Sequence, residues 1–574
     1  MKLHYSISID NPDSHLVKVS ITGEKPASEK ELNFFLPSWS PGSYLMREYG
    51  RNIRWVTAQT SNGEVLYHEQ TTKSEYCINW DKSDLKQEDN KFNFTYEIYC
   101  HELTVRTSHV DNSHAFLHGP SYLMGVHNHE IKDPEISIKF PALWSKLTTG
   151  LKDISESREV FHYTADNYDT LIDAPIEIGC HETDGFMHDG KEHHLAFYGN
   201  LLPHNEDFKK DIKKIVEVVS AHFSSIPYED YTFISHFVPG KFGGLEHLNS
   251  TALQYCSMGL QNRKGYLQWL ALVAHEYFHT WNVKRIRPRE LGPFDYVNEN
   301  YTRMHWLTEG LTSFMDEVLV YRAGLCTLEE YLEMQVGNLN RYLSTPGRKF
   351  HSLEDSSFNA WIKLYRPDEN SLNSSVSYYN KGGIVFWCLN ALLKQKGKQI
   401  DDLLDLLWKS YLDRPELGVD ADEVYSMVKE VGGEDVLNKF QTWIQTTEEI
   451  DLETIFKDSG FEFEYETDEK PWLGFRPDYQ GDRVFIKDVA LDSPAFKAGL
   501  NAGDELIAVN NMRVVKDRFD DHQKYLFKDK SYTFTVSRLE NLVEVELVPE
   551  TTPRTIKKIK IADSEKANHT LVKK

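Results

Sequence analysis

The stretch ALVAHEYFHTWNV, residues 271–283, places two histidines four positions apart with a glutamate between them. It overlaps GYLQWLALVAHEYFHTW, residues 265–281, a proline-free segment whose apolar stripe predicts a helix. On a helix, positions i and i+4 share one face, so His275 and His279 can present two ring nitrogens to one divalent metal ion. Glu276 is rotated from that face and could reach a water molecule without binding the metal.

The alternative is a helix that contains two histidines by chance, because the chain has 24 histidines and the five-residue pattern is short. A zinc site also needs a third protein ligand and an open fourth position. The segment after His279, TWNVKRIRPR, contains no further histidine. We therefore expect the third ligand to be a carboxylate.

Four acidic residues after this segment are candidates for that ligand: Glu290, Asp295, Glu299 and Glu309. We expect Glu309, because it lies in WLTEGLT, inside a helix predicted over 301–323, where flanking leucines can be packed and hold the carboxylate still. Asp316 follows two turns along the same face and could orient a metal-bound histidine. Glu299 has Arg303, not an acidic residue, one turn later.

Length and composition limit the class of protein. With 574 residues the chain has room for about three to five domains. The net charge of −24 argues against nucleic-acid binding, which needs clustered lysine and arginine. The first residues, MKLHYSISIDNPDS, lack the apolar core of a signal peptide, and no apolar run is long enough to span a membrane. Because the cysteines form no CxxC pair, we expect reduced thiols and a soluble, cytoplasmic protein.

Residue patterning divides the chain into segments of different class. Alternating apolar and polar residues in segments such as HYSISI and KFNFTYEIYC predict strands, and DDLLDLLWKSYL and EDVLNKFQTWIQ predict helices. An acidic, weakly patterned segment, 455–470, is interpreted as a linker. The predicted domains are a β-sheet domain at 1–170, a catalytic domain at 171–330, a helical domain at 331–455, a small domain of short strands at 465–552, and a lysine-rich tail, loose or a final strand, at 553–574.

Within the first domain, LPSWSPGSYLMREYGRNI, Leu36–Ile53, combines aromatic residues with two prolines and predicts a rigid, ordered loop. We interpret this loop as a packed connection between sheets rather than as a ligand contact.

The combination of HEYFH and WLTEGLT resembles the zinc aminopeptidases of the gluzincin clan. Over nearly the full length, LPSWSPGSY, FGGLEHLNS, HEYFHTWNVKRIRP, WLTEGLT and YYNKGG follow the order of the glycyl aminopeptidase family, whose members carry a C-terminal PDZ domain. The resemblance implies a multidomain α+β protein. Its expected parts are an N-terminal all-β domain, a thermolysin-like zinc catalytic domain, a mostly α-helical domain and a C-terminal PDZ domain. It also implies that His275, His279 and Glu309 hold Zn²⁺.

The GGLEH segment is similar to a G-x-M-E-N strand of related aminopeptidases, in which the glutamate binds the α-ammonium group of the substrate. The resemblance assigns that role to Glu246, and Gly243 and Gly244 would let the substrate backbone approach the strand. The segment departs from the family pattern at Leu245 and His247. The alternative is a Gly-Gly turn followed by a solvated glutamate.

The YYNKGG segment is similar to a Y-E-K-G segment that opens a helix in related aminopeptidases. There the tyrosine stabilises the negatively charged oxygen of the tetrahedral intermediate. The aligned residue is Tyr379, with Tyr378 beside it. The alternative role for either tyrosine is a core aromatic residue.

The segment DSPAFKAGLNAGDELIAVNNMRV, 492–514, looks like part of a PDZ domain. In PDZ domains the loop aligned with Leu473, Gly474 and Phe475 binds a peptide C-terminal carboxylate through backbone N–H groups, and the peptide adds as a strand. The alternative is that this domain packs on the catalytic unit and binds nothing.

Taken together, the motifs predict a zinc aminopeptidase that acts on peptides with a free N-terminus, with a preference for glycine or alanine implied by the resemblance. Glu276 would serve as the general base for a metal-bound water. Two alternatives are an endopeptidase of the same clan and an inert, PDZ-bearing peptide-binding scaffold. The intact set of four candidate residues in HEYFH and WLTEGLT argues against an inert scaffold.

Overall fold

The structure is a computed structural model that describes residues 1–87, 89–156, 160–200, 207–466 and 471–571. Residues 467–470 of the predicted linker and 572–574 of the predicted tail lie outside the described residues. The chain forms two compact units: the first comprises Met1–Tyr301 and Trp408–Val419, and the second comprises Thr302–Leu407 and Asp420–Lys574.

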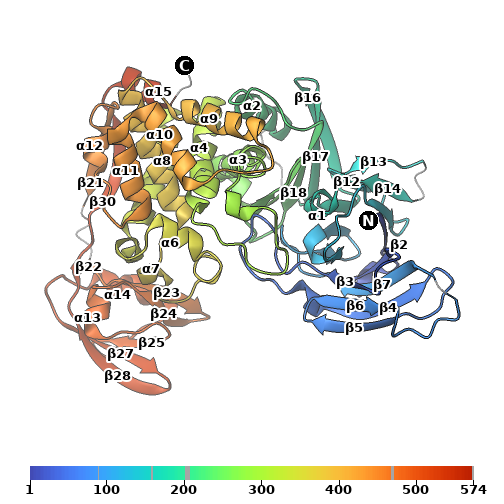
Figure 1. Cartoon of the computed structure of the whole chain (residues 1–574). Coiled ribbons are helices and arrows are strands. Elements are labelled where there is room, and N and C mark those ends of the chain that lie inside the picture. Colours follow the sequence, from blue (N-terminus) through green and yellow to red (C-terminus); the bar gives the residue numbers. More distant parts are fainter. Residues whose placement is uncertain (88, 157–159, 201–206, 467–470, 572–574) are drawn as a thin grey trace. The chain divides into compact units, whose positions relative to one another are not determined.

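The N-terminal part of the first unit is built of β-sheets, as the alternating pattern predicts (Figure 1). A seven-stranded sheet has the order β13 (Lys152–Asp153), β14 (Phe161–Thr164), β11 (Glu135–Lys139), β1 (Leu3–Ser8), β2 (Leu16–Glu24), β7 (Lys91–Tyr99), β4 (Ile53–Thr60). One four-stranded sheet has the order β10 (Gly125–Val126), β3 (Glu31–Phe35), β6 (Glu75–Asn79), β5 (Tyr67–Thr72). Another has the order β12 (Lys146–Thr149), β15 (Ile176–Gly179), β9 (His114–Leu117), β8 (His109–Val110).

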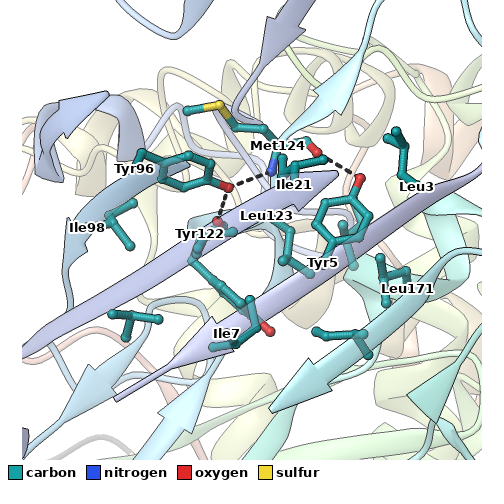
Figure 2. Close-up of a cluster of buried hydrophobic side chains, with 14 of the residues drawn as sticks. Leu3, Tyr5, Ile7, Ile21, Tyr96, Ile98, Tyr122, Leu123, Met124 and Leu171 are labelled. Atoms are coloured by element: carbon teal, nitrogen blue, oxygen red, sulfur yellow. Dashed lines mark hydrogen bonds between the residues drawn. The ribbon is translucent and has the colours of Figure 1, made fainter. Parts of the chain in front are cut away.

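Buried tyrosines join the large sheet to the segment Tyr122–Met124 (Figure 2). The hydroxyl of Tyr5 in β1 donates a hydrogen bond to the carbonyl of Met124 (2.9 Å). The hydroxyl of Tyr96 in β7 donates to the carbonyl of Tyr122 (2.7 Å) and accepts from the Met124 N–H (3.2 Å). The hydroxyls of Tyr5 and Tyr96 are both hydrogen-bonded, so the core holds these two large side chains without leaving their polar atoms unsatisfied.

The rest of the first unit contains a five-stranded sheet covered by helices. Its order is β16 (Glu182–His188), β17 (Lys191–Gly199), β18 (Asp230–Phe237), β20 (Ser250–Tyr255), β19 (Gly243–Glu246). Strands β17, β18 and β20 are parallel, and β19 is antiparallel to β20. Helix α3 (Arg263–Phe278) packs on β19 and β20, and α2 (Phe208–Ser220) packs on α3. The ring of Tyr277 in α3 makes an edge-to-face contact with Tyr231 of β18, with centroids 5.0 Å apart.

Both predicted metal-site helices differ from expectation at their ends. Helix α3 ends at Phe278 rather than at 281, and His279 is its C-cap. The second helix was predicted from 301, but Thr302 Oγ1 accepts the Met304 N–H in a local turn. The helix then begins as a π-helical turn, η6 (Trp306–Gly310), and continues as α4 (Leu311–Arg322).

Helix α8 (Tyr378–Gln395) is the centre of the helical part of the second unit (Figure 1). It contacts η6 and α4, and also α5 (Leu328–Leu343), α6 (Leu353–Phe358), α10 (Ala421–Gly432), α11 (Glu434–Gln445) and α12 (Leu452–Phe456). Helix α9 (Ile400–Asp413) follows α8 in the chain. The predicted helices at DDLLDLLWKSYL and EDVLNKFQTWIQ are therefore confirmed.

The predicted PDZ segment forms its own sheet and core within the second unit. The strand order is β23 (Phe475–Gln480), β24 (Arg483–Val489), β25 (Glu505–Val509), β27 (Tyr532–Arg538), β28 (Asn541–Leu547), with β26 (Met512–Arg513) beside β25. Helices α13 (Pro494–Ala498) and α14 (Lys516–Lys524) accompany this sheet, and β22 (Pro471–Trp472) pairs with β29 (Glu550–Thr551). No helix among the described residues is long and apolar enough to cross a membrane.

The prediction of a linker at 455–470 was wrong over part of that segment. Its residues Glu462, Glu464 and Glu466 lie in β21 (Phe461–Glu466), which pairs with the lysine-rich strand β30 (Thr555–Ile561) ahead of α15 (Ser564–Leu571). Lys560 forms an ion pair with Glu464 across the two strands (2.8 Å). Opposite charges facing each other favour this pairing. The final-strand alternative for the tail is confirmed at Thr555–Ile561, but the helix at Ser564–Leu571 was not predicted.

Candidate active site

The two histidines of HEYFH lie one turn apart at the C-terminal end of α3. Asn262 caps the start of this helix by accepting the Gly265 N–H, and His279 caps its end. The rings of His275 and His279 are 4.6 Å apart between centroids, at an interplanar angle of 87°. Both imidazoles are therefore presented on one side of the helix, as the i, i+4 spacing predicts.

Backbone contacts fix the tautomer of His279. Its Nδ1 lies 2.7 Å from the carbonyl oxygen of Asn282, which can only accept a hydrogen bond, so Nδ1 carries the proton. The lone pair of the neutral ring is then on Nε2, which is the arrangement of a metal-binding histidine. Two imidazoles on one helix face, with carboxylates nearby, are a donor set that suits Zn²⁺.

The carboxylate of Glu276 lies against strand β19. It is 5% exposed, and a Cβ built on Gly244 would lie 2.1 Å from its Oε1. The sequence predicts that Gly244 makes room for substrate backbone. The structure shows that the position of its missing side chain is occupied by the Glu276 carboxylate.

Glu246 places a second buried carboxylate beside Glu276. Its side chain is 4% exposed, and single ligand atoms of Glu246, Glu276 and His279 lie within 4.8 Å of one another. A Cβ on Gly42, in the SPGSY loop, would lie 2.5 Å from Glu246 Oε1, and Gly42 has φ +83°. The solvated-glutamate alternative is therefore wrong, because the carboxylate is enclosed between β19 and this loop.

A cavity of about 130 Å³ in the first unit extends to Glu246. Gly42, Tyr44, Leu248, Val283 and Tyr296 contribute to its wall. Its charged members include Asp173 and Lys284, which form an ion pair with each other (2.8 Å). A cavity of this size can hold a group about as large as a benzene ring.

Glu309 lies in the π-helical turn η6 of the second unit and is 2% exposed. The following residue, Gly310, meets Gly382 of α8 so closely that a Cβ on either would lie within 2.8 Å of the other's Cα. The glycines of WLTEG and YYNKGG thus allow η6 and α8 to cross at backbone contact. π-Helical turns are rare and are frequent at functional sites.

The two tyrosines at the start of α8 have different surroundings. Tyr378 is fully buried and lies against His305, with ring centroids 5.0 Å apart. Tyr379 is partly exposed, and its hydroxyl lies 3.3 Å from that of Tyr365. Burial, and then the charge of Glu309, raise the pKa of Tyr379 well above its ordinary value. Tyr379 therefore keeps its proton near neutral pH and has the more accessible hydroxyl.

The other predicted carboxylates are engaged in local contacts. Asp316 in α4 accepts the backbone N–H of Glu317 (2.5 Å). Burial, and then the charge of Asp316, raise the pKa of Glu317 to about 8. Asp295, one of the less favoured metal-ligand candidates, accepts the N–H groups of Val297 and Asn298 in a turn.

The loop predicted to bind a peptide carboxylate enters the edge strand β23. Gly474 has φ +84°, and a Cβ there would lie 2.1 Å from Cβ of Ser493. Among the described residues, β23 pairs only with β24, so its other edge is open. Pro477 in this strand has no N–H to offer an added peptide.

A second group of potential metal ligands, His114, Glu177 and His236, lies in the core of the first unit. Glu177 accepts hydrogen bonds from His114 Nδ1 (2.8 Å) and His236 Nε2 (2.9 Å). These bonds explain the cluster without a metal ion. Burial alone would raise the pKa of Glu177, but the two histidines outweigh it and lower the pKa to about 2.

Sequence reasoning missed the contribution of the N-terminal β-sheet domain to this site. The SPGSY loop was recognised as rigid but interpreted as a packed connection, whereas Gly42 lies against Glu246. Arg106 was not singled out, although its Nη2 donates to the carbonyl of Gly244 (3.0 Å). Neither contact has a signal in sequence spacing, because each joins residues far apart in the chain.

Comparison with known families places these motifs in one group of peptidases. The N-terminal domain of peptidase M61 matches residues 4–180, and the M61 glycyl aminopeptidase domain matches residues 268–385. A PDZ domain matches residues 471–548. A search of curated proteins returned no match.

Solved structures share the architecture. An aminopeptidase N family protein from Idiomarina loihiensis is 26% identical, with a TM-score of 0.91 over 100% of both chains. An M1 zinc metallopeptidase from Deinococcus radiodurans is 13% identical, with a TM-score of 0.50 over 79% of this chain and 95% of its own. The second similarity is one of fold alone.

Proposed function

This chain belongs to the M61 glycyl aminopeptidase family and is a metallopeptidase, and from that premise we propose that it removes a small N-terminal residue from peptides. The observation that carries the proposal is the buried Glu246 carboxylate beside Glu276 and His279. A carboxylate at that position would bind the free ammonium group of a peptide about one residue from the bond to be cleaved.

We propose His275, His279 and Glu309 as the zinc ligands, with Asp316 orienting one of the histidines. The protonated Nδ1 of His279 and the burial of Glu309 support this assignment. Zn²⁺, when bound, lowers the pKa of a water molecule and polarises the scissile carbonyl group.

Glu276 is proposed as the general base. It accepts the proton of the attacking water and later passes it to the leaving amine. Its contact with Gly244 supports this role, because a carboxylate held against a strand has little freedom to turn away from the reacting atoms.

Tyr379, rather than Tyr378, is proposed to donate a hydrogen bond to the oxygen that becomes negative in the transition state. The partly exposed position of Tyr379 beside Glu309 supports this choice, since Tyr378 is fully buried.

The cavity beside Glu246 is proposed to receive the side chain of the N-terminal residue. Its volume of about 130 Å³ accommodates side chains up to about the size of a benzene ring, glycine and alanine included, and is too small for tryptophan. Alanine amide and tryptophan amide therefore test this preference directly, with faster turnover expected for alanine amide.

The experiment that tests the aminopeptidase proposal compares alanyl peptides with free and N-acetylated N-termini. We expect acetylation to lower kcat/KM by about 100-fold or more, because it removes the charge that Glu246 binds. Equal cleavage of both substrates would instead establish an endopeptidase.

For the PDZ domain we propose that Leu473, Gly474 and Phe475 bind a peptide C-terminal carboxylate, with the peptide along the open edge of β23. The open strand edge supports this, and the missing N–H of Pro477 predicts weak binding. Titration with matched peptides ending in a carboxylate or an amide tests the proposal, and equal affinities would contradict it.

A further inference from the structure

Arg106 of the N-terminal β-sheet domain is held rigidly against the proposed substrate strand. Its carbonyl accepts the Tyr49 hydroxyl (2.6 Å), and its N–H donates to Thr104 Oγ1 (3.1 Å). The preceding residue, Val105, is buried in a small cluster with Leu245 of β19. The backbone that carries the Arg106 side chain is therefore fixed relative to β19.

The guanidinium group of Arg106 has capacity to bind an anion. Nη2 donates to the Gly244 carbonyl (3.0 Å), and Nη1 lies 3.8 Å from the Cβ position of Gly243. Within the described part of the chain, Nε is buried without a hydrogen-bond partner, and no carboxylate forms an ion pair with Arg106. The side chain is partly exposed, so it can be reached by a ligand.

The strand register shows which atoms of β19 face its open edge. The His247 N–H donates to the Ser250 carbonyl (2.9 Å). Because hydrogen-bonded residues alternate along an antiparallel strand, Leu245, two residues earlier, also bonds to β20. The main-chain groups of Gly244 and Glu246 consequently face away from β20. The bond from Arg106 to the Gly244 carbonyl agrees with this register.

A substrate on this edge has a direction and a length. Its ammonium group would lie at Glu246, and the bond to be cleaved would lie between Glu246 and Gly244, beside the Glu276 carboxylate, which is near both residues. Glu246 and Gly244 are two residues apart, or about 7 Å along a strand, which is the length of an extended dipeptide. The guanidinium group of Arg106 also donates a hydrogen bond to the Gly244 carbonyl. A longer peptide could therefore not pair with that carbonyl without displacing the guanidinium group.

We propose that Arg106 binds the C-terminal carboxylate of dipeptides whose ammonium group is bound by Glu246, so that free dipeptides are the preferred substrates. This inference rests on the proposed aminopeptidase function. Arginine suits the role, because its planar guanidinium group forms paired, charge-assisted hydrogen bonds with a carboxylate.

The test is a comparison of alanyl-alanine with alanyl-alanine amide, using the full chain loaded with Zn²⁺. We expect the wild type to have a KM about 10- to 100-fold lower for the free dipeptide, the range of one charge-assisted interaction. Arg106→Gln should abolish the difference between the two substrates by raising the KM of the dipeptide to that of the amide. Arg106→Lys should retain part of the difference, because it keeps the charge without the paired geometry.

The ratio of kcat/KM for dipeptide to that for amide is the decisive readout, since partial misfolding of a variant lowers both values equally. Arg54→Gln is a matched control, because Arg54 is an exposed arginine of the same domain paired with Glu97. A wild-type ratio near one, or a ratio unchanged by Arg106→Gln, overturns the inference. Loss of cleavage of every free-N-terminal substrate by the wild type would contradict the aminopeptidase function itself.

Discussion

Gly244 and Glu276 approach each other so closely that a Cβ on residue 244 would lie 2.1 Å from Oε1 of Glu276. The general base proposed on α3 is thus placed by a glycine on β19, the strand that carries Glu246. The position of the Glu276 carboxylate is therefore defined by α3 and β19 together, and neither HEYFH nor GGLEH defines it alone.

Gly244→Ala is therefore expected to displace Glu276 and lower kcat about 100-fold or more, the contribution of a positioned general base. Circular dichroism should show a folded protein. The matched control is Gly337→Ala, within α5, where an added Cβ meets nothing within 4 Å. That control should keep full activity and gain up to about 1 kcal/mol of stability. Wild-type kcat in Gly244→Ala would contradict the proposed position of the base.

Tyr379→Phe should lower kcat by about 100- to 1000-fold with little change in KM, because the lost hydrogen bond forms only as the oxyanion develops. Steady-state kinetics on alanine amide measures both parameters. Tyr378→Phe is the matched control and should stay within about threefold of wild type, since a buried phenol is not expected to reach substrate. The reverse ranking of the two variants would transfer the role to Tyr378.

The crossing of η6 and α8 predicts a large difference between two adjacent glycines. Gly382→Ala would place a Cβ 2.7 Å from the Gly310 Cα and should cost about 1–3 kcal/mol of unfolding free energy. At Gly383 the nearest atoms are 3.5 Å from the Cβ position, which is ordinary contact. Gly383→Ala should therefore be neutral or stabilising by up to about 1 kcal/mol. Equal melting temperatures for the two variants would show that the crossing is looser than described.

The buried Glu177 cluster predicts acid sensitivity of the first unit. The pKa of Glu177 is lowered to about 2 in the folded protein. As the pH falls below the ordinary pKa of a glutamate side chain, residue 177 therefore binds a proton in the unfolded chain before it does so in the folded protein. The stabilisation by Glu177 is thus fully present above about pH 5 and is lost progressively towards pH 2.

Glu177→Gln should cost about 1–3 kcal/mol at neutral pH, because the amide can accept from one histidine but not satisfy both. It should also flatten the decline in unfolding free energy between about pH 5 and 2 relative to wild type. Urea unfolding across that pH range measures the difference. An unchanged pH profile in the variant would exclude Glu177 as the source.

Local periodicity predicted the helix of HEYFH, and the resemblance to known aminopeptidases predicted the strand of GGLEH and the start of α8 at YYNKGG. The sequence did not predict the π-helical turn at Glu309 or the close approach of Gly310 and Gly382, because neither has a signal in local periodicity. The strand pairing of the acidic β21 with the basic β30 was missed for a related reason, since the partners are distant in the chain.

Within the site, the residue types were predictable, but their neighbours were not. The structure shows the Glu276 carboxylate at the position of a Gly244 side chain, a contact that the sequence did not predict. The contacts of Gly42 with Glu246 and of Arg106 with Gly244 come from a different domain. Tertiary packing determines such contacts, and local patterns in a single sequence do not reveal it.

The most direct test of metal-dependent catalysis through Glu276 is a paired measurement of zinc content and alanine amide hydrolysis for wild type and Glu276→Gln. We expect the variant to bind as much zinc as the wild type, since Glu276 is not a proposed ligand, and to lose about 100- to 10,000-fold in kcat. Full turnover by the zinc-loaded variant would contradict the proposed mechanism.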